Sequence, residues 1–175
     1  MSELNYQGET PSVILADELE QLRVKIIQQH IAAGQKASGR TAKSLHVEVK
    51  AGEGILWGKS PFGVLETGRK AGKVPSNFTG IIKQWLKDKG IQATPIPYKT
   101  DRPHKYTPQE RGQNTLAYFI ARKIAKSGTK LFRDGGRCDI YSNVIPITTK
   151  KIGERITKLL NLTMQSIKLN GTETI

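Results

Sequence analysis

The tripeptide Gly58-Lys59-Ser60 is the first candidate for chemistry, because it matches the end of a phosphate-binding loop. Such a loop needs another glycine five residues before Gly58, so that its backbone amides curl around the phosphate, but this chain has Glu53 there. A helix should then begin and point its N-terminus at the phosphate, yet Pro61 follows at once. This context argues against a nucleotide site, and we expect the tripeptide to follow the returning strand of a hairpin.

Histidine and cysteine offer no alternative centre. His30, His46 and His104 are scattered along the chain and show no metal-ligand spacing. Cys138 is the only cysteine, which excludes an intramolecular disulfide and a cysteine-rich zinc site. No histidine is near Cys138 in the sequence, so we expect a buried structural cysteine rather than a nucleophile.

The acidic residues in the middle of the chain form no convincing pair for acid–base catalysis. The glycine turn at 134–136 is interpreted as a loop rather than as a cradle for an anion. The sequence gives no positive evidence for an enzyme, and we expect no catalytic residue, no cofactor and no metal. The acids considered are Glu66, Asp88, Asp101, Glu110 and Asp134.

The length of 175 residues suits one domain with a hydrophobic core of its own. The first ten residues are polar and acidic, so we expect neither a signal peptide nor a transit peptide. No apolar run approaches the ~18 residues that predict a membrane span. The use of a single cysteine fits synthesis in a reducing compartment.

The net charge of +13 is concentrated in the middle of the chain. Residues 59–137 carry 17 basic and 5 acidic side chains, whereas residues 1–58 carry 6 and 7. Clustered positive charge attracts polyanions. The segment is therefore expected to face nucleic acid or an acidic protein surface, unless it is simply a solvated basic surface.

Hydrophobic periodicity predicts a helix over residues 12–32, because Leu15, Leu19, Leu22 and Ile26 recur in steps of four, three and four. We expect this helix to lie on its own sheet, with a bundle or an oligomer interface as the alternative.

Residues 45–50 alternate between apolar and polar side chains, which predicts a strand with one exposed face. Residues 51–54 supply the loop of a hairpin, residues 55–57 begin the return strand, and residues 62–66 are expected to be extended.

Further along the chain, helices are predicted over residues 78–89, 113–127 and 148–169, and a last strand at about 138–142. In the second of these helices Phe119 is expected to face inward beside Leu116, Ile120 and Ile124. The proline-rich residues 91–112 predict a basic, extended excursion.

These elements predict an α+β fold in one domain over residues 1–175. A small antiparallel sheet, from residues 45–66 and about 138–142, would be packed by an N-terminal helix, two middle helices and a C-terminal helix.

Two short patterns lie on either side of the predicted hairpin: SGRTAKSL at residues 38–45 and VLETG at residues 64–68, followed by Pro75. In this order the patterns resemble those of the tail-completion and head–tail connector proteins of tailed bacteriophages, the minor tail protein family of lambdoid phages. The resemblance covers roughly residues 12–77. The matching positions are Gly39, Arg40, Thr41, Ser44, Leu45, Glu66, Thr67 and Gly68.

The resemblance implies a structural virion protein, made in the host cytoplasm, that forms a homo-oligomeric ring in the neck or tail. The ring would join portal or adaptor to the tail and surround the DNA passage used in genome ejection. Its partners would be other copies of the chain, portal, adaptor or other tail proteins, and packaged DNA, with no membrane. Glu66 would pair with a basic residue, either within the subunit or across a subunit boundary. The residues expected to face DNA or a neighbouring subunit are Arg69, Lys70, Lys73, Lys99, Arg102, Lys105 and Arg111.

The alternative is a stand-alone nucleic-acid-binding protein that uses the basic face of residues 69–137. Direct phosphate contacts by a monomer would make DNA affinity fall steeply with salt, whereas a connector subunit is expected to bind DNA weakly until it assembles. A small hydrolase is a third hypothesis, and it requires a pocket with convergent titratable groups.

Overall fold

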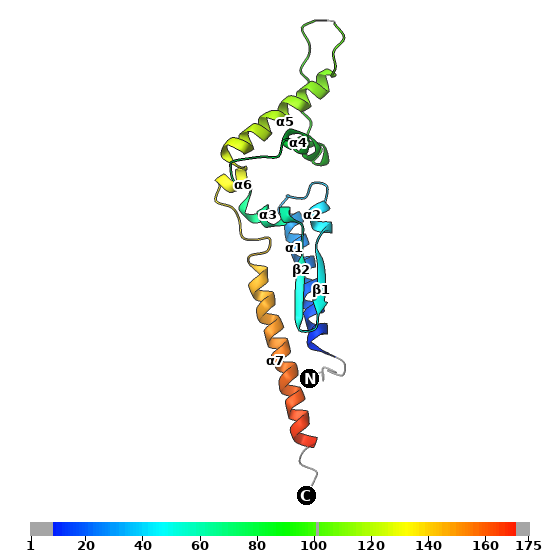
Figure 1. The fold of residues 1–175 in the computed structure, drawn as a ribbon, viewed down its shortest axis with the longest axis vertical. Helices are drawn as coiled ribbons and strands as arrows, with labels where there is room; N and C mark the ends of the chain where they lie inside the picture. The colour runs from blue at the N-terminus through cyan, green and yellow to red at the C-terminus, as the bar shows by residue number, and fades with distance from the viewer. Residues whose placement is uncertain (1–8, 101, 171–175) are drawn as a thin grey trace. The chain divides into compact units, whose positions relative to one another are not determined.

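The chain divides into two compact units in the computed structural model, which describes residues 9–100 and 102–170 (Figure 1). We call the first the helix–hairpin unit and the second the basic unit. The helix–hairpin unit comprises residues 1–34, 41–60 and 138–175, and the basic unit comprises residues 35–40 and 61–137.

The helix–hairpin unit is built around helix α1 (Pro11–Ala32). Strands β1 (His46–Lys50) and β2 (Glu53–Trp57) form an antiparallel hairpin, and both strands pack on α1. Helix α7 (Val144–Asn170) also packs on α1, so α1 is shared by the hairpin and the C-terminal helix. The short helix α2 (Arg40–Lys43) precedes β1.

Helix α1 begins at Pro11, one residue before its predicted start. The Thr10 side chain caps the helix by accepting a hydrogen bond from the Val13 amide at 3.3 Å, and Pro11 occupies the first turn. The predicted apolar face is confirmed at Leu19, Leu22 and Ile26, all of which are buried. Buried residues of this unit also include Ile14, Leu45, Ile140 and Val144.

The hairpin approaches α1 closely at one glycine. Gly54 pairs with Val49, and a Cβ atom on Gly54 would lie 2.6 Å from Cδ1 of Leu19. The absence of a side chain at Gly54 therefore lets β2 rest directly on the helix.

Two of the expected extended segments are not strands. Residues 62–66 lie in a 3₁₀ turn, η1 (Ser60–Gly63), followed by helix α3 (Val64–Thr67). The Gly68 amide closes this helical turn by donating to the Val64 carbonyl at 2.9 Å, and Gly68 ends it with a φ of 70°. Residues 138–142 form turns instead of a strand, because the Asn143 amide bonds back to the Cys138 carbonyl at 3.2 Å.

The core of the basic unit lies between α4 (Phe78–Asp88) and α5 (Pro108–Ser127). Ile82 and Leu86 of α4 meet Ala117 and Ala121 of α5, and the small alanines let the helices approach. The unit also contains the short helix α6 (Lys130–Arg133).

Helix α5 differs from its prediction at its start and on its buried face. It begins at Pro108 instead of residue 113, because Thr107 and Glu110 form a capping box. Phe119 faces outward and is 59% exposed. The prediction for Phe119 was wrong because Ala117 and Ala121 set the buried face, and two residues along a helix turn the side chain by about 200°.

The predicted fold class is confirmed: an antiparallel hairpin packs on an N-terminal helix, with middle helices and a C-terminal helix completing an α+β fold. Among the described residues, no helix combines the length and apolar character needed to cross a membrane.

Candidate functional site

Glu66 of the VLETG pattern (residues 64–68) and the residues just after this pattern hold two parts of the basic unit together. We call residues 66–72 together with residues 125–137 the clasp. The Arg69 amide donates to the Thr129 hydroxyl, and the Thr129 amide donates to the Arg69 carbonyl, both at 2.9 Å. The Arg137 amide donates to the Glu66 carbonyl at 2.9 Å, and the Glu66 side chain is 2% exposed. The clasp is therefore a structural element, and Glu66 lies inside it.

Glycines allow the two sides of the clasp to meet. Gly68 has a φ of 70°, and a Cβ atom there would lie 2.5 Å from the Phe132 amide nitrogen. Gly128 has a φ of 76°, and its Cβ atom would lie 2.7 Å from the Arg69 carbonyl oxygen. Both positions favour glycine twice over, by backbone conformation and by close approach.

Arg69, expected to face DNA or another subunit, is used within the basic unit. It is half-buried, and its Nη2 donates to the Lys73 carbonyl at 2.8 Å. Its guanidinium lies 5.4 Å from the centre of the Phe78 ring. Lys70 and Lys73 on the same segment are exposed. Thr67 is also exposed.

The proline-rich excursion is fixed at its base by glutamines of α5. Gln113 Oε1 accepts from the Ala93 amide at 2.9 Å, and its Nε2 donates to the Ile91 carbonyl at 2.9 Å. Gln109 donates to the Ala93 carbonyl at 3.1 Å. These bonds satisfy backbone groups that no helix or strand pairs.

A stack of three side chains holds the Tyr98 and His104 segments of the excursion against α5. The rings of Tyr98 and His104 lie 3.5 Å apart and nearly parallel, and the guanidinium of Arg111 lies 4.6 Å from the Tyr98 ring centre. Arg111 also donates to the Pro97 carbonyl at 3.0 Å, so it is a structural residue of the loop. The remaining basic residues of the excursion are exposed: Lys99, Arg102 and Lys105.

The SGRTAKSL pattern (residues 38–45) leads into β1, and its Ser44 side chain bonds to the chain that follows β2. The Ser44 hydroxyl donates to the Thr41 carbonyl at 2.7 Å and accepts from the Lys59 amide at 3.2 Å. Leu45 is 5% exposed. The Lys59 amide therefore bonds to Ser44 and is not arranged with its neighbours as a phosphate loop.

Gly39 and Arg40 of the SGRTAKSL pattern belong to the basic unit. Gly39 is buried and has a φ of 77°, a backbone conformation that favours glycine. Nη2 of Arg40 lies 3.8 Å from a carboxylate oxygen of Asp88, so Arg40 pairs with the end of α4.

The two units differ sharply in charge. The residues of the helix–hairpin unit include ten basic and ten acidic side chains, which gives a net charge of zero. Those of the basic unit include 18 basic and 5 acidic side chains, so this unit holds the entire excess of +13. Five of the seven predicted interface residues are exposed in the basic unit, whereas Arg69 and Arg111 are committed to internal contacts.

A buried polar cluster joins α7 to α1 in the helix–hairpin unit. Glu18 is 1% exposed and accepts from Arg155 at 2.6 Å and from Lys151 at 2.9 Å. Arg155 also pairs with Asp17 at 2.6 Å and with Glu9 at 2.5 Å. Hydrogen bonding to Glu18 and Asp17 raises the pKa of Arg155, and the bond from Arg155 lowers the pKa of Asp17.

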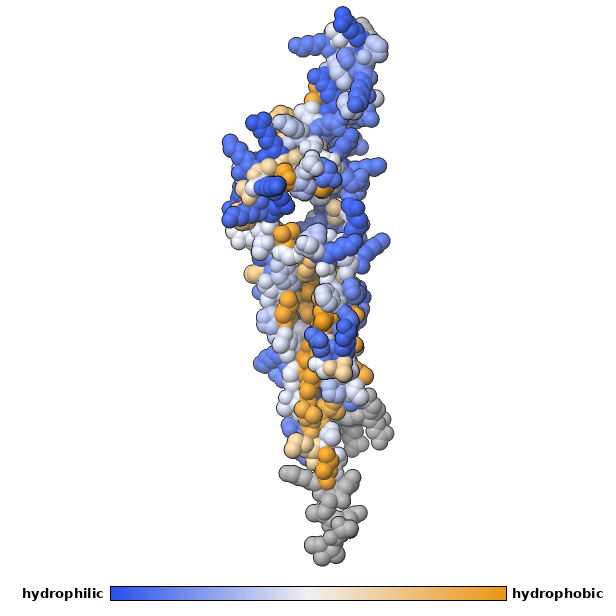
Figure 2. All heavy atoms as spheres, viewed as in Figure 1, coloured by the Kyte–Doolittle hydropathy of each residue, from blue (hydrophilic) through white to orange (hydrophobic). Residues whose placement is uncertain are grey.

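The sequence predicts an apolar stripe of Ile152, Ile156, Leu159, Leu160 and Ile167 on the C-terminal helix, and part of this stripe is exposed on the second half of α7. Ile156, Leu160, Met164 and Ile167 recur in steps of four, four and three, and the last three are 53%, 59% and 65% exposed. Figure 2 shows hydrophobic atoms along this part of the unit. The periodicity was visible in the sequence, but nothing in the sequence tells which of the apolar positions α1 would cover.

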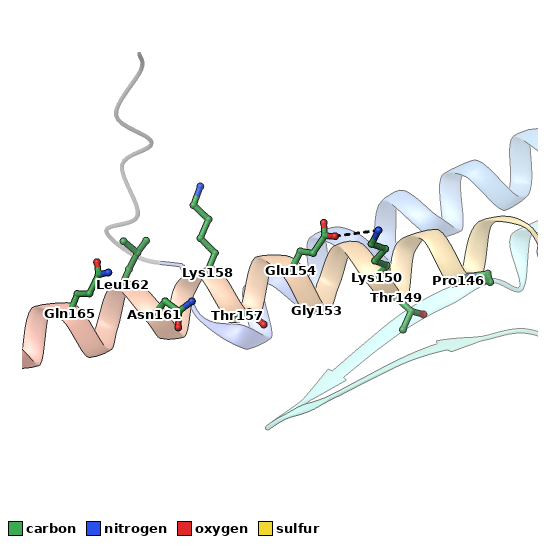
Figure 3. A pocket seen from close by; sticks show the side chains of 10 residues that line it. All are labelled: Pro146, Thr149, Lys150, Gly153, Glu154, Thr157, Lys158, Asn161, Leu162 and Gln165. Atoms are coloured by element: carbon green, nitrogen blue, oxygen red, sulfur yellow. Dashed lines mark ion pairs between the residues drawn. The ribbon is translucent and has the colours of Figure 1, made fainter.

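A shallow groove runs along another side of α7, and all the residues that line it come from this one helix (Figure 3). Thr149, Gly153 and Thr157 lie along it, and Lys150 pairs with Glu154 at 3.8 Å. Since no second element forms an opposing wall, the groove is a helix surface and not an enclosed pocket.

The reactive residue types do not converge. Cys138 is exposed, so the prediction of a buried cysteine was wrong: the turn at 138–142 points Ile140, not Cys138, into the core. Among residues 9–100 and 102–170, no group of three or more His, Cys, Asp or Glu side chains is arranged to hold a metal ion.

The comparisons with protein-family models, with curated proteins and with solved structures find no match for this chain.

Proposed function

We propose that this chain is a structural subunit of a tailed-phage virion. It forms a ring in the neck or tail that joins portal or adaptor to the tail and surrounds the DNA passage. The observation that carries the proposal is the division of charge between the units: the helix–hairpin unit is neutral and the basic unit holds +13. Such a subunit can assemble through one unit and present the other to a polyanion or to acidic neighbours.

The helix–hairpin unit has the properties of an assembly module. Residues 159–167 carry no charged side chain, and three large apolar side chains there are more than half exposed. Exposed apolar surface of this kind is typical of protein–protein contact sites. A contact between different surfaces of identical subunits closes into a ring when the rotation fits, so one small chain can form a channel wall.

The basic unit has exposed cations that could contact a polyanion or an acidic neighbour. Lys70 and Lys73 are exposed beside the clasp, and Lys99, Arg102 and Lys105 are exposed on the excursion. The hydrogen bonds of the clasp and the Tyr98 stack hold the neighbouring segments, and such contacts lower the entropy that binding a partner would otherwise cost.

The residues behind the resemblance to connector proteins add support. Gly39, Leu45, Glu66 and Gly68 occupy positions where burial or a positive φ restricts the residue type. Their roles are structural, which is what a shared scaffold requires.

The proposal is tested by the mass of the purified protein in solution, by electron microscopy of the same sample, and by mass spectrometry of purified virions. We expect a closed ring of one mass and the presence of the chain in virions. Met164→Glu with Ile167→Glu should shift the protein to monomers, because charge would enter an apolar contact.

The matched control is Asn161→Glu with Gln165→Glu, which adds the same charge to the groove side of the same helix. This control should keep the ring. A monomer at all concentrations, absent from virions, contradicts the proposal, whereas a ring that both pairs of substitutions leave intact contradicts the assignment of the exposed apolar residues of α7 as its contact surface.

The second candidate function is stand-alone nucleic-acid binding by the basic unit. The observation that favours it is the run from 111 to 133, which contains six basic and no acidic residues. A monomer that binds DNA with a steep salt dependence supports this candidate.

A further inference from the structure

The outer side of α5 combines aromatic and basic side chains that take no part in the hydrogen bonds of the clasp or in the buried core described above. Tyr118 and Phe119 are followed one turn later by Arg122 and Lys123, and Lys126 continues the row. At helical spacing these five residues share one side of the helix. The opposite side holds Ala117 and Ala121, which are buried against α4. We call these five residues the α5 face.

The two aromatic rings of the α5 face form an exposed pair. Tyr118 is 50% exposed and Phe119 is 59% exposed. Their ring centres lie 5.7 Å apart in an edge-to-face arrangement. A ligand that covers the two rings would be favoured by the burial of their apolar surface.

The charge around the rings is of one sign. Arg122, Lys123 and Lys126 are exposed, and α5 has no acidic residue after Glu110. Glu110 itself is held at the other end of the helix by the capping box with Thr107. A surface with three cations and no anion is complementary to a row of phosphates.

We propose that the α5 face binds single-stranded nucleic acid. Arg122, Lys123 and Lys126 contact phosphates, and Tyr118 and Phe119 stack on unpaired bases. Flat aromatic rings beside lysine and arginine are the combination that single-strand binding proteins use, because every base has a face on which a ring can stack. In a duplex the faces of the bases are already stacked, so the rings favour a single strand.

The inference does not depend on the ring proposed above. A chain that fails to form rings can still bind a single strand through the α5 face, and a ring that binds none leaves the assembly role intact. The two hypotheses are separated by making the α5 substitutions in the Met164→Glu/Ile167→Glu variant, which is expected not to form rings. The α5 substitutions should still weaken binding of a single strand in that variant.

The experiment measures fluorescence anisotropy of a labelled oligothymidylate and of a duplex of equal length over a range of salt concentrations. The oligonucleotide should exceed the ~4–16 nucleotides that one small binding domain covers. The full chain is compared with Arg122→Gln/Lys123→Gln/Lys126→Gln. The matched control is Lys36→Gln/Lys83→Gln/Lys87→Gln, which removes the same charge from other exposed positions of the basic unit.

The expected slope of log affinity against log salt is about −0.7 per phosphate contact on a single strand, so the α5 triple variant should lower its magnitude by about 2. The control triple should change it by much less. Tyr118→Leu with Phe119→Leu should weaken binding of the single strand roughly tenfold or more and leave the salt slope unchanged. All the substituted residues are exposed, so circular dichroism should show the same helix content in all variants.

Three outcomes overturn the inference. Equal losses from the α5 triple and the control triple would mean that the net charge alone attracts DNA. Duplex binding as tight as single-strand binding, with no effect of the leucine pair, would remove the stacking role. Displacement of the oligonucleotide by poly-glutamate at equal charge concentration would assign the face to an acidic protein.

Discussion

Arg155 Nη1 lies 2.6 Å from a carboxylate oxygen of Glu18, which is almost fully buried between α1 and α7. The two residues are far apart in the sequence, and their contact belongs to the polar cluster through which Arg155 and Lys151 tie the C-terminal helix to the N-terminal one. A buried carboxylate needs such partners, because removing one of them leaves charge without compensation.

Arg155→Ala should therefore destabilise the docking of α7 on α1. Breaking a buried ion pair costs ~3–5 kcal/mol, and the remaining Lys151 should place the loss near the lower end of that range. Urea unfolding measures it. Lys150→Ala is the control, because its pair with Glu154 is exposed and such pairs contribute ~0–1 kcal/mol. Equal losses from the two substitutions would contradict the assigned role of Arg155.

Asp17 should make the stability of the helix–hairpin unit depend on pH in the acidic range. The hydrogen bond from Arg155, and after it the bond from Gln21, lowers the pKa of Asp17 below its ordinary value of 3.8. Its stabilising contribution is therefore complete above pH ~4 and is lost as the pH falls through the lower, folded-state pKa. Asp17→Asn should be less stable than the natural protein at pH 7 and equal to it below the folded-state pKa.

The control for that pH dependence is the same substitution in an Arg155→Met background. Because Arg155 is the first cause of the lowered pKa, Asp17→Asn should have little effect there at any pH. A full effect of Asp17→Asn without Arg155 would show that another group holds the carboxylate.

Gly128 should tolerate alanine less well than Gly135. Both have a positive φ, 76° and 89°, and Gly128 also has a ψ of 177°, a combination that only glycine adopts readily, so alanine there carries a backbone cost of roughly 1–3 kcal/mol. Only at Gly128 would the new Cβ atom also meet the Arg69 carbonyl, whereas nothing lies within 4 Å at Gly135. Thermal unfolding should give a clearly larger loss for Gly128→Ala, and equal losses would mean that the clasp is not closely packed.

Thr129 should matter through its hydroxyl group. Thr129 Oγ1 accepts from the Arg69 amide at 2.9 Å and from the Phe132 amide at 3.3 Å. Thr129→Val keeps the shape but leaves these donors without an acceptor, which costs ~1–3 kcal/mol for a buried group. Hydrogen exchange at Arg69 should accelerate in Thr129→Val and stay slow in Thr129→Ser. Unchanged protection in the valine variant would contradict the clasp.

Elements with a strong periodic pattern could be predicted from the sequence. Leu19, Leu22 and Ile26 marked the buried side of α1, and the alternation around Val47 and Val49 marked β1, because burial on one side imposes a regular spacing. The extent of the sheet could not be predicted in this way. Residues 62–66 are too short to distinguish one helical turn from a strand, and a helical hydrogen bond to Gly68 decides the outcome.

The roles of individual charged residues were harder to predict than the location of the charge. The excess of positive charge in the middle of the chain was plain from the sequence. Whether Arg69 and Arg111 point outward depends on Phe78 and Tyr98, aromatic partners that the sequence does not assign to them. The α5 face was missed for a similar reason, since Phe119 fits an apolar pattern that Ala117 and Ala121 in fact define.

All of the basic unit except residues 35–40 is one uninterrupted stretch, from 61 to 137, which leaves the helix–hairpin unit after β2 and returns before α7. A single recombination event spanning that stretch would exchange almost the whole electrostatic character of the protein. The helix and hairpin framework would keep its own core through such an exchange. Exchange of this one segment would therefore give related chains a new binding surface. The helix–hairpin unit that carries the segment would not have to change.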